Sequence, residues 1–178
     1  YVFVRTGSSW AFEAKLLASD RAFDDRLGAA AAIDGDTAVV TSRADDYFGL
    51  FEVGSAYVFT RTSGIWTQQA KLIPSDGAGS DNFGSSVGLF GNKIVVGSIF
   101  DTHSGLTNAG SAYAYQRSAS GWSQQAKLTA IDAAASDRAG FSVGLSADTA
   151  IIGAFGHAHT GLGSSGAAGI SGPLSAAM

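Results

Sequence analysis

Apolar and polar residues alternate along short stretches of this chain. In the middle of the chain, Val87 and Leu89 share one face of an alternating segment, and 94–96 is a continuous apolar run of the kind covered on both faces. The segment 57–61 is aromatic and β-branched, and apolar residues alternate with polar ones over 66–72. These patterns predict four short strands in each structural unit, and no stretch has the spacing of an amphipathic helix.

The pattern repeats every 56 residues without insertion or deletion. Residues that fall in register include Tyr1, Tyr57 and Tyr113, then Trp10, Trp66 and Trp122, then Gly28, Gly84 and Gly140. Four antiparallel strands per repeat of this length, joined by Gly- and Ser-rich turns, are typical of a β-propeller blade. We therefore predict an all-β propeller segment over 1–170, with repeats at about 1–56, 57–112 and 113–168, followed by a tail at 171–178.

The phase of the repeat predicts incomplete blades at both ends. If each blade begins near Gly28, Gly84 and Gly140, the residues before Gly28 supply only strands three and four. After Gly140 we expect only strands one and two, because 166–169 has no aromatic strand. The chain would then hold two whole blades and two complementary half blades, fewer than the four to eight blades of known propellers.

This shortfall leaves two hypotheses open. In one, the first strand of one chain, formed by Tyr1, Val2, Phe3 and Val4, adds to the C-terminal half blade of another chain and builds a ring or a filament. In the other, the chain is a piece of a seven-bladed protein from which a leader or more has been removed, since it lacks an initiator Met.

Three segments of the middle repeat resemble a known family. Asp81-Asn82-Phe83-Gly84, then Ile94 to Ser98, then Gly110 to Tyr113 are similar to the FG-GAP repeat of the integrin alpha-chain propeller, especially its bacterial extracellular versions. The resemblance implies a seven-bladed propeller that serves in adhesion or as a scaffold on secreted proteins. It also implies an extracellular or cell-surface location.

Composition narrows the classes of partner. The net charge of −4 argues against nucleic acid, because phosphate binding needs clustered Lys and Arg. No apolar run approaches the roughly 20 residues that span a bilayer, so we expect no membrane span. The absence of Cys leaves the redox compartment undefined.

Each link between blades carries two Asp residues five positions apart. They are Asp20 and Asp25, Asp76 and Asp81, and Asp132 and Asp137. Such carboxylates could ligate Ca²⁺ or cap backbone N–H groups, and the FG-GAP calcium string Asp-x-Asp-x-Asp-Gly is absent from every copy. We favour capping and expect no required cofactor, with calcium as the alternative.

The loops between strands two and three differ most among the repeats, and they are the candidate binding loops. Their candidate residues are Asp45, Asp46, Tyr47, Asp101, His103, His157 and His159. They would contact a protein or glycan ligand, and the histidines offer a weaker case for a transition-metal site. We interpret the three in-register Trp residues as packing between sheets, and the lysines of strand four as structural and facing a repeat Asp.

Catalysis has little support in the sequence. There is no Cys, and no Gly-x-Ser-x-Gly segment lies between a strand and a helix. We expect a non-catalytic extracellular adhesion or interaction scaffold. The alternatives are a self-assembling structural subunit and a propeller module of a larger secreted enzyme. The identity of the ligand is left open.

Overall fold

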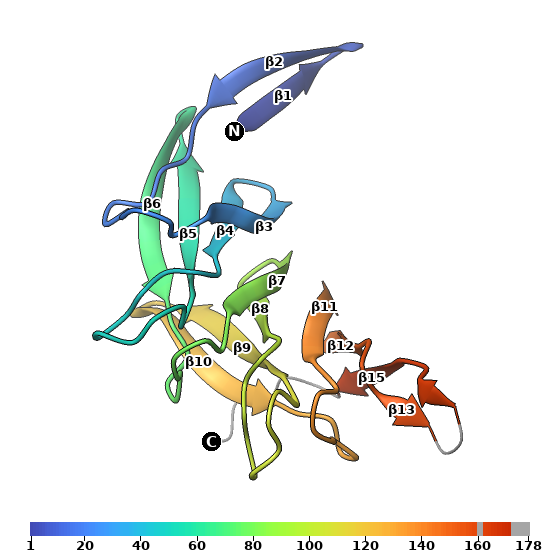
Figure 1. The fold of residues 1–178 in the computed structure, drawn as a ribbon. Helices are drawn as coiled ribbons and strands as arrows, with labels where there is room; N and C mark the ends of the chain where they lie inside the picture. The colour runs from blue at the N-terminus through green and yellow to red at the C-terminus, as the bar shows by residue number, and fades with distance from the viewer. Residues whose placement is uncertain (160–161, 172–178) are drawn as a thin grey trace.

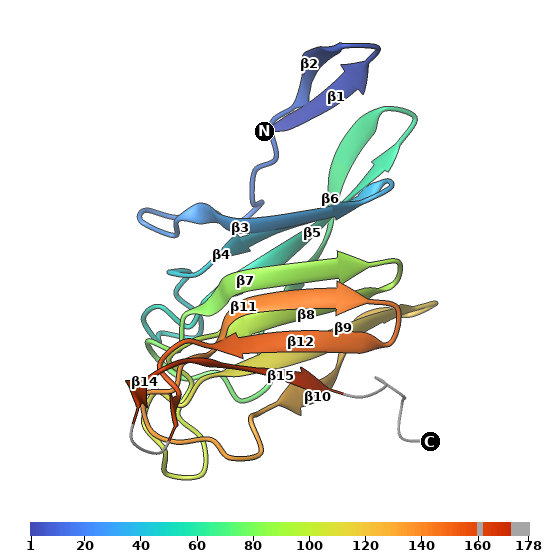
Figure 2. The ribbon, with the colours of Figure 1, turned by 90° about the vertical axis from the view of Figure 1, so that its right-hand side faces the viewer.

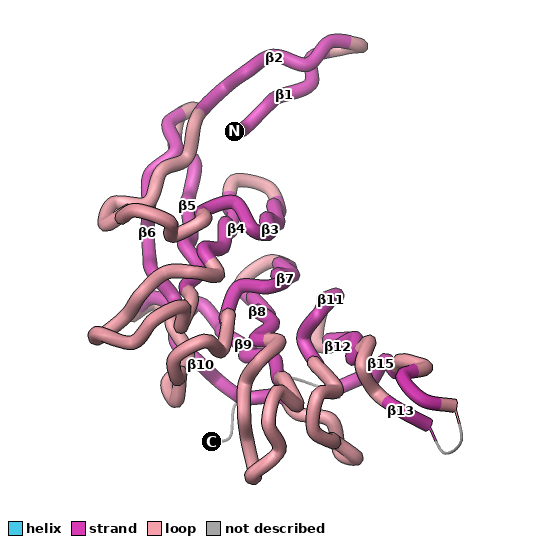
Figure 3. Tube along the Cα trace, in the orientation of Figure 1, coloured by secondary structure: helices cyan, strands magenta, loops and turns pink. Residues whose placement is uncertain are grey.

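The computed structural model describes residues 1–159 and 162–171, and every regular element in these ranges is a β-strand (Figure 3). No helix in these ranges is long and apolar enough to cross a membrane. The prediction of an all-β chain is therefore confirmed for the described residues.

Two complete four-stranded blades form the middle of the molecule. The second blade contains β3 (Leu27–Asp34), β4 (Thr37–Ser42), β5 (Ser55–Thr62) and β6 (Ile65–Leu72) in that order. The third blade contains β7 (Phe83–Phe90), β8 (Lys93–Ser98), β9 (Ser111–Ser118) and β10 (Gly121–Leu128) in the same order. All neighbouring strands are antiparallel, as predicted for propeller blades.

The sheets at the two ends are incomplete, as predicted. The first blade is a hairpin of β1 (Val2–Thr6) and β2 (Ser9–Ala14). The fourth blade contains β11 (Ala139–Ser146), β12 (Thr149–Ala154) and β15 (Ala167–Ser171). A small hairpin of β13 (Ala158–His159) and β14 (Gly163–Ser164) lies between β12 and β15.

The fourth blade is larger than the half blade expected from the sequence. β15 pairs with β12 in the register of a third strand, since Gly153 is opposite Ala168 just as Gly97 is opposite Ala112 in the third blade. A ladder is built from backbone groups, so small residues form it without aromatic side chains. The edge of β12 proposed for another chain's first strand, Tyr1 to Val4, is therefore occupied, and the two terminal sheets are not complementary halves. Of the predicted tail, only Ser171 is described, and 172–178 lies outside the described residues.

The blades are arranged as a fan, with β3, β7 and β11 side by side along its inner edge (Figures 1 and 2). The core lies between facing sheets. Between the second and third blades, Val39 and Val58 pack with Phe83, Ile94 and Tyr113, all of them buried. A second cluster joins the third and fourth blades, and a third joins the first link, through Leu16 and Ala18, to the second blade. Each sheet is thus stabilised mainly by burial of apolar side chains against its neighbours.

The in-register tryptophans follow this packing. Trp66 and Trp122 are half-buried and contact the core clusters between neighbouring sheets, as predicted. Trp10 is 67% exposed, because in the described structure no sheet packs on the far side of the N-terminal hairpin. The same position is therefore structural in two repeats and exposed in the first.

One end of the fan carries the long connections. At this end, which we call the loop face, lie the links between blades (15–26, 73–82 and 129–138). The loops between strands two and three (43–54, 99–110 and the described parts 155–159 and 162–166) lie there too. Figure 2 shows it on the left, with the short hairpin turns at the opposite end. The candidate binding residues and the Asp pairs therefore share one end of the molecule.

Candidate functional site

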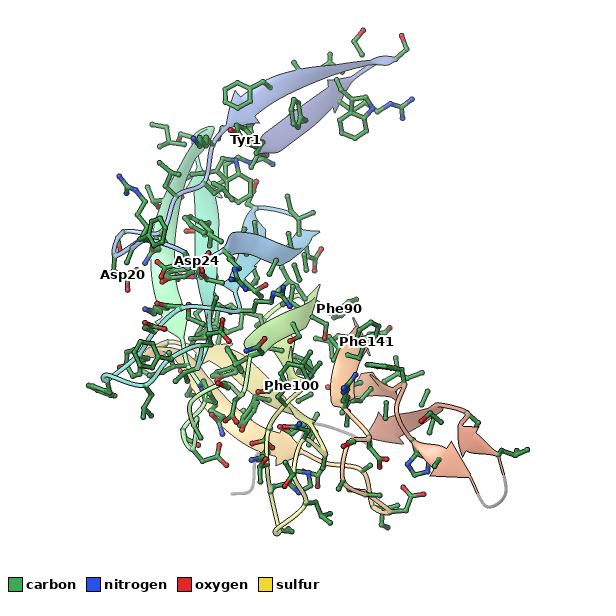
Figure 4. The ribbon with its side chains drawn as sticks, in the orientation of Figure 1. Tyr1, Asp20, Asp24, Phe90, Phe100 and Phe141 are labelled. Carbon is green, nitrogen blue, oxygen red and sulfur yellow. The ribbon has the colours of Figure 1, made fainter. Side chains whose placement is uncertain are left out.

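A polar cluster on the loop face, in which Asp45 is buried and Asp20 is exposed, ties the first link to the second blade. The ammonium group of Lys71 on β6 lies 2.7 Å from carboxylate oxygens of both Asp20 and Asp45. The Tyr57 hydroxyl donates a hydrogen bond of 3.1 Å to Asp45. Lys71 also lies 5.3 Å from the centre of the Tyr57 ring, within the range of a cation–π contact. Figure 4 labels Asp20 on the link that runs beside this blade.

The electrostatics of the cluster keep its groups in their present charge states at neutral pH. Burial opposes the charge on Lys71, but hydrogen bonds with Asp20 and Asp45 raise its pKa above the ordinary value. Burial also opposes ionisation of Asp20, yet hydrogen bonds from Lys71 and Tyr57 hold its pKa below the ordinary value. Burial raises the pKa of Tyr57 to about 12. The cluster is therefore one ammonium group held by two Asp side chains, with the pKa values of Lys71 and Asp20 shifted so that each favours its charged form.

The third blade repeats this arrangement 56 positions later. Lys127 lies 2.8 Å from Asp76 and 2.9 Å from Asp101, and the Tyr113 hydroxyl donates a 2.9 Å hydrogen bond to Asp76. Lys71 and Lys127 thus face a repeat Asp, as expected. Asp45 and Asp101, proposed as ligand-binding residues, are buried in these clusters and are not exposed to a ligand.

The fourth blade has a different cluster. His157 occupies the position of Asp45 and Asp101, and it is buried, although we proposed it as a ligand-binding residue. Its Nδ1 lies 2.9 Å from Asp137 and its Nε2 lies 3.6 Å from Asp132. The hydrogen bond with Asp137 is the main cause that raises the pKa of His157. The side chain of its proposed metal partner, His159, is outside the described structure.

The second Asp of each pair accepts a backbone hydrogen bond. Asp25, Asp81 and Asp137 each accept an N–H bond from the residue three positions earlier, at 2.7 Å from Ala78 for Asp81 and from Ala134 for Asp137. These contacts agree with the capping interpretation. The first Asp residues of the second and third blades, by contrast, pair with lysines.

No group of three or more metal-ligating side chains is present in the part of the chain that the structure describes. In the second and third blades, the first Asp of the proposed pair is already bound to a lysine ammonium group, Asp20 to Lys71 and Asp76 to Lys127.

The loops between strands two and three end in small hairpins. Residues 47 and 50 form a bridge in the first of these loops, and residues 103 and 106 form the matching bridge in the second. Asp46 is exposed and its Oδ1 accepts a hydrogen bond of 2.9 Å from the backbone N–H of Glu52. His103 Nε2 lies 3.2 Å from the carbonyl oxygen of Gly110. Asp46, Tyr47 and His103 therefore lie at the loop tips, where a ligand could contact them.

Sequence reasoning missed the most exposed apolar residues of these loops. Phe48 is 88% exposed and Phe51 is 74% exposed. The second repeat has Ser104 and Thr107 at the same positions. Comparing the repeats position by position would have shown that these two positions are aromatic only in the first loop.

A family model described as FG-GAP repeat matches the chain three times, over residues 10–59, 66–115 and 122–170. None of the curated proteins compared with the chain matches it. The three matched segments have the spacing of the structural repeat and together cover most of the strands.

Proposed function

The chain belongs to the FG-GAP repeat family, and from this premise we propose that it is a non-catalytic extracellular scaffold that binds a protein ligand through its loop face. The repeats themselves support a propeller-like protein-interaction module. Such repeats are typical of extracellular or cell-surface proteins. Adhesion to a specific ligand is the finer part of the proposal.

The observation that carries the proposal is the contrast between the scaffold and its loops. Buried apolar residues and Lys–Asp clusters recur in register in the second and third blades. The exposed tips of the loops differ, with Tyr47 and Phe48 in one repeat against His103 and Ser104 in the next. A rigid framework that presents divergent loops at one end is the arrangement used for specific recognition.

The chemistry of the buried groups supports a non-catalytic role. A general base needs a nitrogen or oxygen that can accept a proton from a substrate or nucleophile. Both ring nitrogens of His157 face carboxylates, and the carboxylates of Asp20 and Asp76 are neutralised by lysines. These clusters therefore stabilise links between blades, and we assign them no catalytic step.

Binding to an array of purified extracellular proteins tests this function. A loop-face variant would carry Arg43→Ala, Asp46→Ala and His103→Ala, and a control variant would carry Thr62→Ala and Ser120→Ala at the opposite end. We expect the wild-type chain to bind at least one array protein, with affinity about tenfold weaker in the loop-face variant and unchanged in the control. Failure to bind any array protein, or equal losses in both variants, would contradict the proposal.

Self-assembly is a second candidate, favoured by the unpaired strand edges of the terminal sheets. In the described structure, β1 has a neighbouring strand only on the β2 side, and β15 only on the β12 side. Phe3 and Phe12 on the N-terminal hairpin are also more than half exposed. Such edges accept further strands. The mass of the protein in solution tests this candidate, which predicts concentration-dependent oligomers that a deletion of residues 1–18 abolishes.

A further inference from the structure

The loop between β4 and β5 ends in an apolar projection that we call the aromatic tip, consisting of residues 47–51. Phe48, Leu50 and Phe51 are 88%, 45% and 74% exposed. The loop extends away from the sheets on the loop face (Figure 1). Single exposed apolar residues are common on protein surfaces and need no explanation. Here, in contrast, three large apolar side chains of one short loop lie in solvent.

The aromatic tip is held in one conformation. The backbone N–H of Tyr47 donates to the carbonyl oxygen of Leu50 at 3.0 Å, and the N–H of Leu50 donates to that of Tyr47 at 2.9 Å. At the base of the loop, the N–H of Gly54 donates to the carbonyl oxygen of Asp45 at 2.9 Å. The rings of Tyr47 and Phe48 are in tilted contact, with centres 4.2 Å apart and planes at 58°. A pre-formed tip loses little conformational entropy when it binds, which favours affinity.

The turn does not require an aromatic residue at its apex. Phe48 has φ of 52°, a left-handed conformation that is unfavourable for a bulky side chain. Ser104 adopts φ of 53° at the same place in the second repeat, followed by Gly105 as Phe48 is followed by Gly49. Since a serine forms this turn in the same fold, neither the turn nor the core explains Phe48. Strain of this kind often persists where a side chain serves a function.

Acidic groups flank the aromatic tip. Asp46 precedes it and Glu52 follows it, and both side chains reach solvent. Glu52 forms an ion pair with Arg26 at 3.9 Å. Both side chains of this pair are exposed, so the pair is weak. An apolar projection between carboxylates complements an apolar pocket with a basic rim. The same carboxylates disfavour the anionic surface of a cell membrane.

We propose that the aromatic tip is the anchor by which this chain binds a protein partner, and that the partner offers an apolar pocket rimmed by Lys or Arg. This inference rests on the proposed function. Aromatic side chains inserted into such pockets commonly supply most of the affinity of an interface. The carboxylates at 46 and 52 then orient the partner and accelerate its association.

The test replaces the aromatic tip with residues that the second repeat uses. The tip variant carries Phe48→Ser and Phe51→Thr, and a control variant carries Phe23→Gly and Ile131→Ser, which are also residues found at equivalent positions of other repeats. Melting curves confirm that both variants fold. Both are then assayed against the array of extracellular proteins, alongside neutral phosphatidylcholine vesicles.

We expect the tip variant to lose about tenfold or more of its affinity for the array proteins that bind the wild-type chain, and the control to lose none. Binding by the wild-type chain should also weaken as NaCl rises from about 50 to about 500 mM, because rim charges are screened. If the tip variant binds as well as wild type while the loop-face variant does not, the anchor lies elsewhere and only this inference fails. Absence of any binding defeats the function as well.

Two further outcomes would overturn the choice of partner. Vesicle binding that is lost in the tip variant would make the aromatic tip a lipid-inserting loop. Self-association that is lost in the tip variant, measured by light scattering, would make a second copy of the chain its occupant. Either result, without a tip-dependent array protein, contradicts the proposal.

Discussion

At positions 45, 101 and 157 the three repeats place Asp, Asp and His in the same part of the fold. The two Asp residues pair with lysines, whose pKa values are raised by these carboxylates despite burial, whereas the pKa of the histidine is raised from an ordinary value of about 6.5. A single substitution between repeats therefore makes the fourth blade sensitive to pH. The groups that face His157 are Asp132 and Asp137, and Lys127 lines the same groove beside it.

The pH dependence follows from the raised pKa of His157. A folded-state pKa above the ordinary value of about 6.5 means that protonated His157 stabilises the native state below that pH. This stabilisation is lost as pH rises through the raised pKa. We expect the gap in free energy of unfolding between wild type and His157→Asn to shrink between about pH 6 and pH 9. Urea titrations at each pH measure it. The gap for Lys71→Met should stay constant over this range, and a constant gap for His157→Asn would contradict the assignment.

Removal of the lysine from a buried cluster should be costly. Lys71→Met leaves Asp45, which is 5% exposed, without its cation. We expect a loss of about 1.5–3 kcal/mol in the free energy of unfolding, the usual cost of deleting a hydrogen bond to a charged group. Asp20→Asn should cost about 1 kcal/mol or less, because that carboxylate is largely solvated. Urea denaturation at pH 7 compares the two. Equal losses would show that burial of Asp45 is not decisive.

Part of this chemistry could be predicted from the repeat and part could not. The register placed Lys71 and Lys127 opposite a repeat Asp, and the structure confirms those pairs. The burial of Asp45, Asp101 and His157 was not predicted. Each is covered by a link between blades, and the pattern of apolar and polar positions does not show where such a link packs in the folded chain. The exposure of Phe48 depends likewise on the direction in which the loop extends.

At the scale of the strands, the glycine that ends each loop between strands two and three lies, in the first two of these loops, directly against the next blade. A Cβ atom at Gly54 would overlap the carbonyl oxygen of Phe83, where the next blade begins, and one at Gly110 would overlap that of Ala139. At Gly166, the third equivalent, the nearest atom would lie 3.7 Å away. All three have positive φ. Glycine is therefore required at 54 and 110 both for the positive φ and for the absence of a Cβ atom. At 166 only the positive φ requires it.

These glycines provide a matched set of substitutions. Gly54→Ala and Gly110→Ala should each cost more than about 2 kcal/mol, because strain in the left-handed region adds to the overlap with the next blade. Gly166→Ala should cost about 1–2 kcal/mol from backbone strain alone. Thermal unfolding followed by circular dichroism ranks the three variants. A variant at Gly166 that melts as low as one at Gly54 would contradict the role of the inter-blade contact.

The strands themselves were predicted well except for β15. Alternation and aromatic residues identified the other blade strands, because their side chains pack between sheets. β15 begins Ala-Ala-Gly, residues with low β-propensity, and it pairs because β12 presents an open edge in the correct register. Local sequence does not contain that information. The edge becomes visible only when the fourth blade is assembled.

At the scale of the whole molecule, calcium should be dispensable for folding. Each second Asp residue accepts a backbone N–H bond, and the first Asp residues at 20 and 76 are already paired with Lys71 and Lys127. We expect a chelator to leave the melting temperature unchanged, and added Ca²⁺ to have no effect. Differential scanning calorimetry in both conditions measures this. A fall of many degrees with chelator, reproduced by Asp76→Asn with Asp81→Asn, would mean that the links are metal sites.

Contacts between blades recur at nearly constant separation along the chain. Lys71 reaches Asp20 and Lys127 reaches Asp76 across 51 residues, and Ser19 and Ser75 receive glutamine side chains across 49. A gene that gains or loses one 56-residue unit by recombination therefore keeps every such partner, wherever within the unit the exchange occurs. The loop tips are the part that is free to diverge after each duplication. This geometry lets a lineage change the number of blades and the binding specificity independently of each other.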